Sequence, residues 1–192
     1  MKNLLQNKSI PIILRKRTYD ATVLNILLFG CESWALKEKD RDKLEACHHK
    51  FLRAMLNLSM MDVKELRITN EMVRNELNSY ALWQIMELRR AKWLQKLALM
   101  PKSRNPRKLF VSWIRKPRPA GRPRQAIRHG YAETIGTYLK YGKGNSSFNH
   151  WMEDAKNLDA WKKRVEGSLK LKPGTYKIAI RKGTQANNRI IN

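Results

Sequence analysis

Apolar side chains recur at three- and four-residue spacings along most of the chain, a spacing that collects them on one face of a helix. No stretch alternates apolar and polar residues between turn signals, as a half-buried strand does. The segment after Asp40 is typical, because its apolar positions share one helical face: Leu44, Cys47, Phe51, Met55 and Leu58. The sequence therefore predicts an all-α fold.

Glycine, proline and capping side chains indicate where the helices of the first half begin and end. A helix over about residues 18–28 should end at Gly30, because glycine readily takes the left-handed conformation that closes a helix. Three residues that favour helix N-termini predict the next helix starts: Asp40, Thr69 and Ser79. The last of these helices should reach Met100 and end before Pro101.

The second half of the chain is divided by a proline-rich segment. A brief helix should open at Pro106, and residues 115–124 (RKPRPAGRPR) should form a loop because three prolines and a glycine interrupt them. A helix should cover about residues 125–141, and the basic residues beyond Gly167 lack an apolar pattern. We therefore divide the chain into four parts: helical residues 1–100, a basic Pro/Arg-rich linker at 101–124, a second helical region at 125–166 and a disordered basic tail at 167–192.

Positive charge is the most unusual property of the composition. The chain has 40 Lys and Arg against 16 Asp and Glu, which leaves a net charge of +24 at pH 7. Residues 101–130 contain ten of the basic residues and no acidic one, so they supply +10 of this total. A concentrated excess of this size attracts polyanions. Nucleic acid is the expected partner, although charge alone leaves a ribosomal or membrane-surface role open.

Basic side chains on the long helix before Pro101 and on the proline-rich loop are the candidates for phosphate contacts. The prolines keep the loop extended, and its arginines can pair bidentately with phosphates. The GRPR sequence at 121–124 loosely resembles an AT-hook core, but Ala120 replaces the usual leading arginine. A merely solvated linker is the alternative. The expected nucleic-acid-binding residues are Arg89, Arg90, Lys92, Lys96, Arg115, Lys116, Arg118, Arg122, Arg124 and Arg128.

Six tryptophans accompany this charge. Exposed indole rings could stack on unpaired bases. Four of them nevertheless have apolar neighbours at helical spacing: Trp83, Trp93, Trp151 and Trp161. Packing in a hydrophobic core is therefore the favoured interpretation for these rings.

Three groups of residues carry side chains that could support chemistry. No strand precedes Cys31, and neither the papain-like pattern nor Gly-x-Ser-x-Gly surrounds it. The Cys-His-His triplet at 47–49 cannot converge on one metal ion, because adjacent helical residues point about 100° apart. The Glu153-Asp154 pair has only Asp159 as a nearby carboxylate, too few for a two-metal site. We therefore expect no catalytic residue, no metal site and no cofactor.

The compartment is indicated by the cysteines and the longest apolar run. Two cysteines cannot make a disulfide framework. The run around residues 21–29 is interrupted by Asn25 and is far shorter than the roughly 20 residues that span a bilayer. The N-terminus lacks the apolar region of a signal peptide. We expect an intracellular protein, nuclear rather than cytoplasmic, with no membrane partner.

The stretch LLFGCESWAL at 27–36, followed by LEACHHKFLRAMLNL at 44–58, resembles the region after the polymerase palm in reverse transcriptases of non-LTR (LINE-like) retrotransposons. That family commonly has Leu-Leu-Tyr-Gly-x-Glu-x-Trp and then a helix with Leu-Glu and Leu-Arg pairs. The matching residues are Leu27, Leu28, Phe29, Gly30, Glu32, Trp34, Leu44, Glu45, Leu52 and Arg53. Further similar segments follow in order, and extend the resemblance over about residues 19–165: ITNEMVRNEL, RRAKWLQKLALMP, GRPR and DAWKKRV.

This resemblance implies a thumb-like helical bundle and a post-thumb region that grip a template-primer duplex. The palm, with its paired catalytic aspartates, would lie upstream of Met1. The chain would then be a non-catalytic, nucleic-acid-binding fragment of a reverse transcriptase-like protein, of RNA-directed DNA polymerase ancestry, with a separately encoded palm domain as a further partner. A helical protein-interaction module, or a decayed open reading frame with no selected activity, is the alternative.

In the matched stretch Gly30, Glu32 and Trp34 form the structural motif. Gly30 should stop one helix, Glu32 and Ser33 should cap the following turn, and Trp34 should fill the corner. Substitution Trp34→Ala should therefore lower the free energy of unfolding by about 3 kcal/mol or more if the ring is buried. Substitution Cys31→Ala should affect only stability or should have no effect, because we expect no catalytic role for its thiol. Urea unfolding of both variants checks these outcomes, and a larger loss for Cys31→Ala than for Trp34→Ala would contradict them.

Overall fold

The computed structural model describes residues 2–115, 131–141, 147–173 and 175, and all regular structure in these ranges is helical. The expectation of an all-α chain is confirmed for these residues. The elements are α1 (Lys2–Gln6), α2 (Ile12–Ala21), α3 (Val23–Leu27), a 3₁₀ turn η1 (Cys31–Ser33), α4 (Glu38–Met55), α5 (Met60–Glu65), α6 (Asn70–Glu76), α7 (Leu82–Leu99), α8 (Asn105–Arg115), a π-helical turn η2 (Thr134–Tyr138), α10 (Ser147–Lys156) and α11 (Leu158–Ser168).

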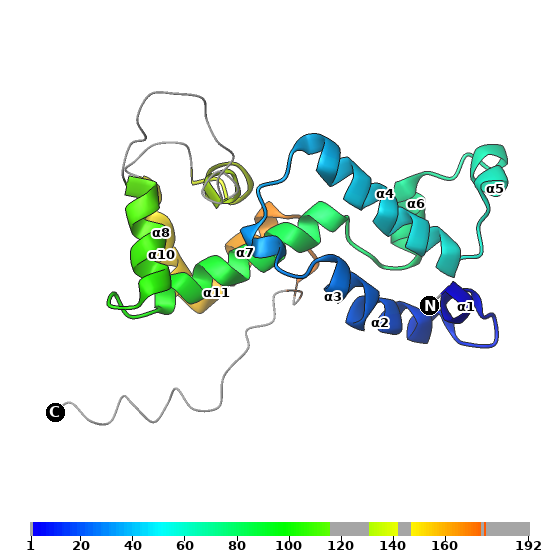
Figure 1. Ribbon diagram of the computed structural model, residues 1–192, viewed down its shortest axis with the longest axis horizontal. Coiled ribbons are helices and arrows are strands. Elements are labelled where there is room, and N and C mark those ends of the chain that lie inside the picture. Colours follow the sequence, from blue (N-terminus) through cyan, green and yellow to red (C-terminus); the bar gives the residue numbers. More distant parts are fainter. Residues whose placement is uncertain (1, 116–130, 142–146, 174, 176–192) are drawn as a thin grey trace.

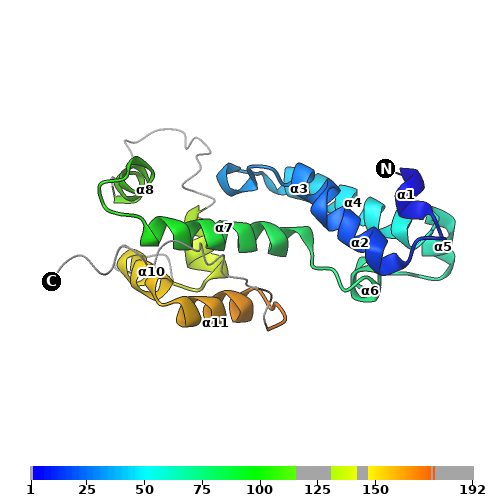
Figure 2. The ribbon, with the colours of Figure 1, turned by 90° about the horizontal axis from the view of Figure 1, so that it is seen from below.

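Helix α7 runs through the middle of an elongated molecule and joins two groups of helices (Figures 1 and 2). Helices α1 to α6 lie toward its first half, α8 and α10 lie at its second half, and α11 runs alongside it, back toward its start. Each half contributes to a different cluster of buried apolar residues: Leu82 and Met86 to the first, Ala91, Leu94 and Ala98 to the second. The expected boundary after residue 100 therefore falls at the end of a helix that both clusters share.

The first cluster packs α2, α3 and α4 against the start of α7. Tyr19, Leu52 and Met55 are fully buried in it. Arg15 is buried as well, and its guanidinium donates to the carbonyl oxygens of Leu5 at 3.0 Å and Met55 at 2.8 Å. Carbonyls in the last turn of a helix have no partner within the helix. Arg15 therefore closes the ends of α1 and α4 at once.

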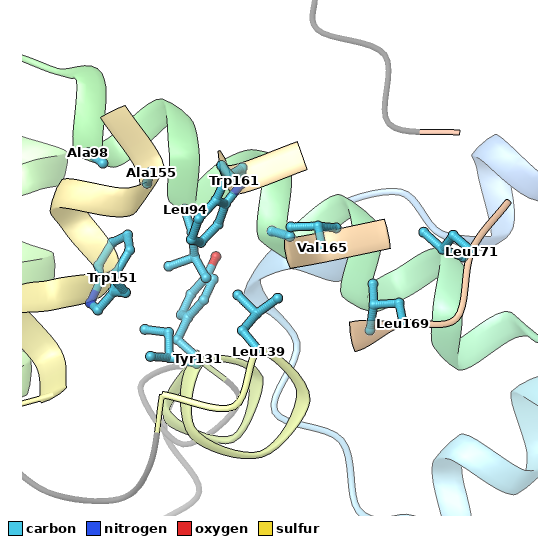
Figure 3. Packing of buried hydrophobic residues seen from close by; sticks show 12 residues of the cluster. Leu94, Ala98, Tyr131, Leu139, Trp151, Ala155, Trp161, Val165, Leu169 and Leu171 are labelled. Carbon is cyan, nitrogen blue, oxygen red and sulfur yellow. The ribbon is translucent and has the colours of Figure 1, made fainter. Parts of the chain in front are cut away.

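Two tryptophans form the centre of the second cluster (Figure 3). Trp151 of α10 and Trp161 of α11 have no exposed surface, and their ring centroids lie 6.3 Å apart. Leu94 of α7 and Val165 of α11 pack in the same cluster. The prediction that tryptophans fill the core is confirmed for Trp151 and Trp161.

Trp83 and Trp93 lie nearer to the surface than their apolar spacing predicts. Trp83 is 39% exposed and stacks on Tyr138, with 5.6 Å between the ring centroids. Trp93 is half-buried, and the ammonium group of Lys96 lies 5.3 Å from its ring centroid. Because α7 is packed on several sides, its apolar spacing does not define a single buried face.

Five helices end at a leucine followed by a residue other than glycine in the left-handed conformation. These residues are Asn57, Arg67, Asn78, Lys140 and Lys170. The backbone N–H of the residue after the left-handed one donates a hydrogen bond to a carbonyl near the helix end, for example from Leu58 to Arg53 at 3.0 Å. After the π-helical turn the equivalent bond spans one residue more, from Tyr141 to Ile135 at 3.1 Å. These helices therefore close without glycine.

The start of α7 lies two residues later than predicted, because Ser79 does not cap it. The side-chain oxygen of Gln84 accepts a hydrogen bond from the Ala81 amide, and a carboxylate oxygen of Glu45 accepts one from the Leu82 amide, both at 2.9 Å. Glu45 belongs to α4, so half of this cap comes from another helix. A cap of that kind leaves no signal in the local sequence.

The other helix boundaries of the first half agree with the sequence only in part. The helix predicted over about residues 18–28 is two helices, which meet at Thr22; its hydroxyl donates to the carbonyl of Thr18 at 2.7 Å. Asp40 lies in the first turn of α4 and does not cap it. Thr69 caps α6 as predicted.

Much of the predicted linker and tail lies outside the described residues. This applies to residues 116–130 and to residues 176–192. The loop predicted at 115–124 is therefore described only at Arg115. The tail was expected to begin at residue 167, and this boundary is wrong. Leu169 and Leu171 are 0% and 8% exposed and pack in the second cluster, because they close α11.

The buried histidine of α4 predicts how stability depends on pH. His48 has no exposed surface; its Nδ1 lies 2.6 Å from the Tyr19 hydroxyl and its Nε2 3.3 Å from the Tyr80 carbonyl oxygen. Burial, with help from nearby His49, Lys16 and Arg74, lowers the pKa of His48 from 6.5 to about 4. As the pH falls, His48 is therefore protonated at a higher pH in the unfolded chain than in the folded one.

The contribution of His48 to stability should be complete above about pH 6.5 and should be lost as the pH falls toward 4. Lowering the pKa of His48 from 6.5 to about 4 corresponds to a loss of about 3 kcal/mol in the free energy of unfolding at pH 4. Urea unfolding at pH 7 and pH 4 measures it, and His48→Gln should remove this part of the dependence. Replacing the exposed His150 by Gln is the matched control. Equal pH dependence in wild type and His48→Gln would contradict the prediction.

Candidate nucleic-acid interface

The stretch LLFGCESWAL forms the connection between α3 and α4. Gly30 takes the left-handed conformation, with φ of 68°, as predicted. The Ser33 hydroxyl donates to the Gly30 carbonyl at 2.9 Å and tightens the 3₁₀ turn. Cys31 is fully buried, and burial raises the pKa of its thiol to about 11, with the neighbouring Glu32 as a smaller cause. A buried, protonated thiol is a poor nucleophile. The stretch is therefore a structural connection, and we call residues 27–36 the Gly30 joint.

Trp34 is only half-buried in the first cluster. The loss expected for Trp34→Ala therefore falls below that of a fully buried ring. The more direct link of this residue to the rest of the molecule is its backbone, because the Trp34 carbonyl oxygen accepts a hydrogen bond from Arg90 at 2.6 Å. Neither Glu32 nor Ser33 makes a side-chain cap to a following helix in the described residues.

Arg90 is the centre of a buried polar group that joins α7, the Gly30 joint and η2. Its side chain is 1% exposed, and Nη1 lies 2.7 Å from a carboxylate oxygen of Glu87. The other carboxylate oxygen of Glu87 accepts a hydrogen bond from the Thr134 hydroxyl at 2.6 Å. Burial raises the pKa of Glu87, and Arg90 and Thr134 oppose this shift. Arg90 was expected to contact nucleic acid, and its burial in this group corrects that expectation.

Arg89 also makes hydrogen bonds within the molecule. One nitrogen of its guanidinium donates to the carbonyl of Leu28 at 3.1 Å, and another donates to the side-chain oxygen of Asn25 at 2.5 Å. These bonds hold the end of α3 against α7. Arg107 does the same at the end of α7, where its guanidinium donates to the carbonyls of Ala98 and Met100. Arginines of this chain therefore bind backbone carbonyls near helix ends.

In the part of the candidate interface that the structure describes, the exposed cations are mostly lysines. Lys92 and Lys96 are exposed on the second half of α7, as the sequence predicted. Three further exposed cations follow on the connection to α8 and on α8 itself: Lys102, Arg104 and Lys108. The sequence interpretation counted these three in the total charge but did not select them. The signal that identifies them is their position in the acid-free segment.

The remaining predicted contacts cannot be placed on this surface. Arg115 is the last residue of α8, and its side chain is outside the described part. The other five positions fall in residues 116–130, which are not described: Lys116, Arg118, Arg122, Arg124 and Arg128. Four of the ten predicted residues are therefore placed, and the structure brings Lys92 and Lys96 to the surface while it holds Arg89 and Arg90 in structural bonds.

Acidic side chains gather on a different part of the molecule. Glu38, Asp42 and Glu45 of α4 line a cleft of about 310 Å³, together with residues of α7 and η2. Arg41 bridges this region to η2 through an ion pair with Glu133 at 2.7 Å. The second half of α7 and the described part of α8 contain no carboxylate, so a polyanion would be attracted there rather than to the cleft.

The groups that could have supported chemistry are occupied by structural contacts. His48 bonds within the first cluster, and His49 Nε2 lies 2.9 Å from an Arg74 nitrogen. Asp154 accepts a hydrogen bond from the Tyr141 hydroxyl at 2.6 Å and pairs with Arg164 at 3.2 Å. Among the described residues, no three metal-ligating side chains come together.

None of the described helices combines the length and the apolarity that a membrane span requires. Comparisons with protein-family models, with curated proteins and with solved structures return no match to this chain. Assignment of a function therefore rests on the residues and their arrangement.

Removing the buried cation should cost far more stability than removing an exposed one. Substitution Arg90→Ala leaves the Glu87 carboxylate buried without its partner, so we expect a loss of about 3–5 kcal/mol in the free energy of unfolding. Lys96→Ala, on the same helix, should stay within about 0.5 kcal/mol of wild type. The double variant Glu87→Gln/Arg90→Met should recover part of the loss. Urea unfolding distinguishes them, and a stable Arg90→Ala protein would show that the pair is dispensable.

Proposed function

We propose that the chain is a non-catalytic, nucleic-acid-binding region of a reverse transcriptase-like protein of the non-LTR retrotransposon family. The observation that carries this proposal is the charge of residues 88–132, which contain fourteen Lys and Arg and no Asp or Glu. The described part of this segment exposes several of these cations on α7 and α8. Such a surface neutralises phosphates without reading bases.

The arrangement of the cations favours backbone contacts over sequence-specific ones. Lysine ammonium groups are flexible point charges, which suit phosphates at variable positions. The two arginines of α7, Arg89 and Arg90, are held by Leu28, Asn25, Glu87 and Trp34, which leaves Arg104 as the arginine among the exposed cations described above. We therefore propose that a duplex or hybrid is bound by its shape and backbone.

The resemblance of the Gly30 joint to the region after the polymerase palm supports the same proposal. In this chain the joint is tied to α7 by Arg90 and Arg89, so the matched residues set the position of the helix that carries exposed lysines. A thumb would need such a rigid connection between its base and its nucleic-acid-binding helix. We propose that polymerisation chemistry would come from a separately encoded palm domain.

A protein-interaction module is the second candidate, because exposed apolar side chains gather on α5 and α6. Met60, Met61, Leu66 and Met72 are each more than half exposed. Methionine-rich surfaces adapt to many partners. A helical partner would bind this end of the molecule, away from the exposed cations of α7, so the two candidate functions predict contacts at different residues.

Nucleic-acid affinity should depend steeply on salt. If about six phosphates are neutralised, the logarithm of affinity should fall against the logarithm of salt concentration with a slope of about −5. The triple variant Lys96→Ala/Lys102→Ala/Lys108→Ala should make the slope shallower by about 2 to 3. Fluorescence anisotropy with a labelled duplex measures both values.

A charge-matched control separates this surface from general attraction. The triple variant Lys39→Ala/Lys50→Ala/Lys64→Ala removes three exposed cations from α4 and α5. It should keep a slope close to that of wild type. A flat salt response of the wild-type protein, or equal effects of the two triple variants, would overturn the proposed interface.

A further inference from the structure

A groove of about 690 Å³ lies between the Gly30 joint, the second half of α7 and the start of α8. Its lining is mostly apolar, and four of its side chains are aromatic: Phe29, Trp93, Phe110 and Tyr131. This volume lies in the range of about 300–1,000 Å³ that is usual for small-molecule sites. None of the candidate phosphate contacts explains why the groove has this lining.

Phe29 is the most exposed of the large apolar side chains that line the groove. Its side chain is 83% exposed, and Leu109 on the opposite wall is 56% exposed. Phe110 is fixed against Tyr131 by an edge-to-face contact, with 5.2 Å between ring centroids. The groove therefore offers one largely exposed aromatic side chain, Phe29, and rings that pack against each other, an arrangement suited to a flat aromatic ligand.

Charged side chains at the groove suit a nucleotide better than an apolar partner. Arg89 lines it, and Lys96 lies over the ring of Trp93, which is part of the wall. A nucleotide places its base on apolar rings and its phosphate near cations. Glu32 adds one carboxylate to the lining, and a carboxylate accepts hydrogen bonds from the amino groups of bases.

We infer that this groove holds one unpaired base of a nucleic-acid strand, with the strand's phosphates on the exposed cations of α7 and α8. The inference rests on the proposed function, because the backbone contacts deliver the base to the groove. It goes beyond that function by assigning a separate base-binding site. Bases with an exocyclic amino group should bind more tightly than thymine or uracil, since thymine and uracil offer Glu32 only a ring N3–H that two carbonyl oxygens flank, and these oxygens repel a carboxylate.

The test compares a blunt DNA duplex with the same duplex carrying a short single-stranded overhang, at equal salt. Wild-type protein should bind the overhang duplex more tightly. Phe29→Ala should weaken binding to the overhang duplex about tenfold and leave binding to the blunt duplex unchanged. Phe29→Tyr, which keeps the ring, should retain the preference. Because Phe29 is largely exposed, these changes should leave the fold intact.

Ile26→Ala is the matched control, since Ile26 is 75% exposed on α3 and does not line the groove. It should bind both duplexes as wild type does. A second arm uses overhangs of adenine or thymine with Glu32→Gln, which should reduce the preference for adenine. Circular dichroism and urea unfolding confirm that each variant is folded.

Several outcomes would overturn the inference while leaving the proposed function intact. One such outcome is that Phe29→Ala binds both duplexes with wild-type affinity. Another is that Phe29→Ala loses the same affinity for the blunt duplex as for the overhang duplex. Tight binding of free adenosine monophosphate, independent of any strand, would assign the groove to a mononucleotide instead. A concentration-dependent dimer that Phe29→Ala abolishes would assign it to a second copy of the chain. Failure of the wild-type protein to bind either duplex would overturn the proposed function itself.

Discussion

The buried pair of Arg90 and Glu87 fixes how the elements around α7 are placed. Two charges removed from water are costly, and the mutual attraction of the pair offsets this cost only with additional hydrogen bonds. Here the partners come from two other segments, the carbonyl of Trp34 and the hydroxyl of Thr134. The pair lies between Met86 of the first cluster and Ala91 of the second. It therefore couples the two hydrophobic clusters through the helix that they share.

The sequence predicted the helices better than it predicted their faces. Apolar spacing identified α4 and α7 because long helices repeat the signal over several turns. It could not place Arg90, because a buried arginine and an exposed one look alike until its partners Glu87 and Trp34 are brought together. Burial of the Trp151 ring followed from spacing, whereas exposure of Trp83 did not, since tertiary packing covers α7 on several sides.

Helix ends were missed for a different reason. The sequence interpretation used glycine, proline and N-terminal capping residues as its signals. Ser79 satisfied that rule without capping α7, because Glu45 and Gln84 supply the acceptors. Leu-Asn-Leu at 56–58 and Leu-Lys-Leu at 169–171 would have identified two of the closures, since each places a leucine before the left-handed residue and a second leucine after it.

The residues with a left-handed backbone give some of the chain's basic side chains a structural role at helix ends. Arg67, Lys140 and Lys170 stand just beyond helix C-termini, where the helix dipole favours a cation by about 0.3–1 kcal/mol. That gain offsets part of the strain that a side chain brings to a left-handed backbone. Together with Arg15, Arg89 and Arg107 at backbone carbonyls, these residues use positive charge to terminate helices. A share of the +24 is therefore architectural, because it closes helices and joins their ends whether or not a polyanion binds.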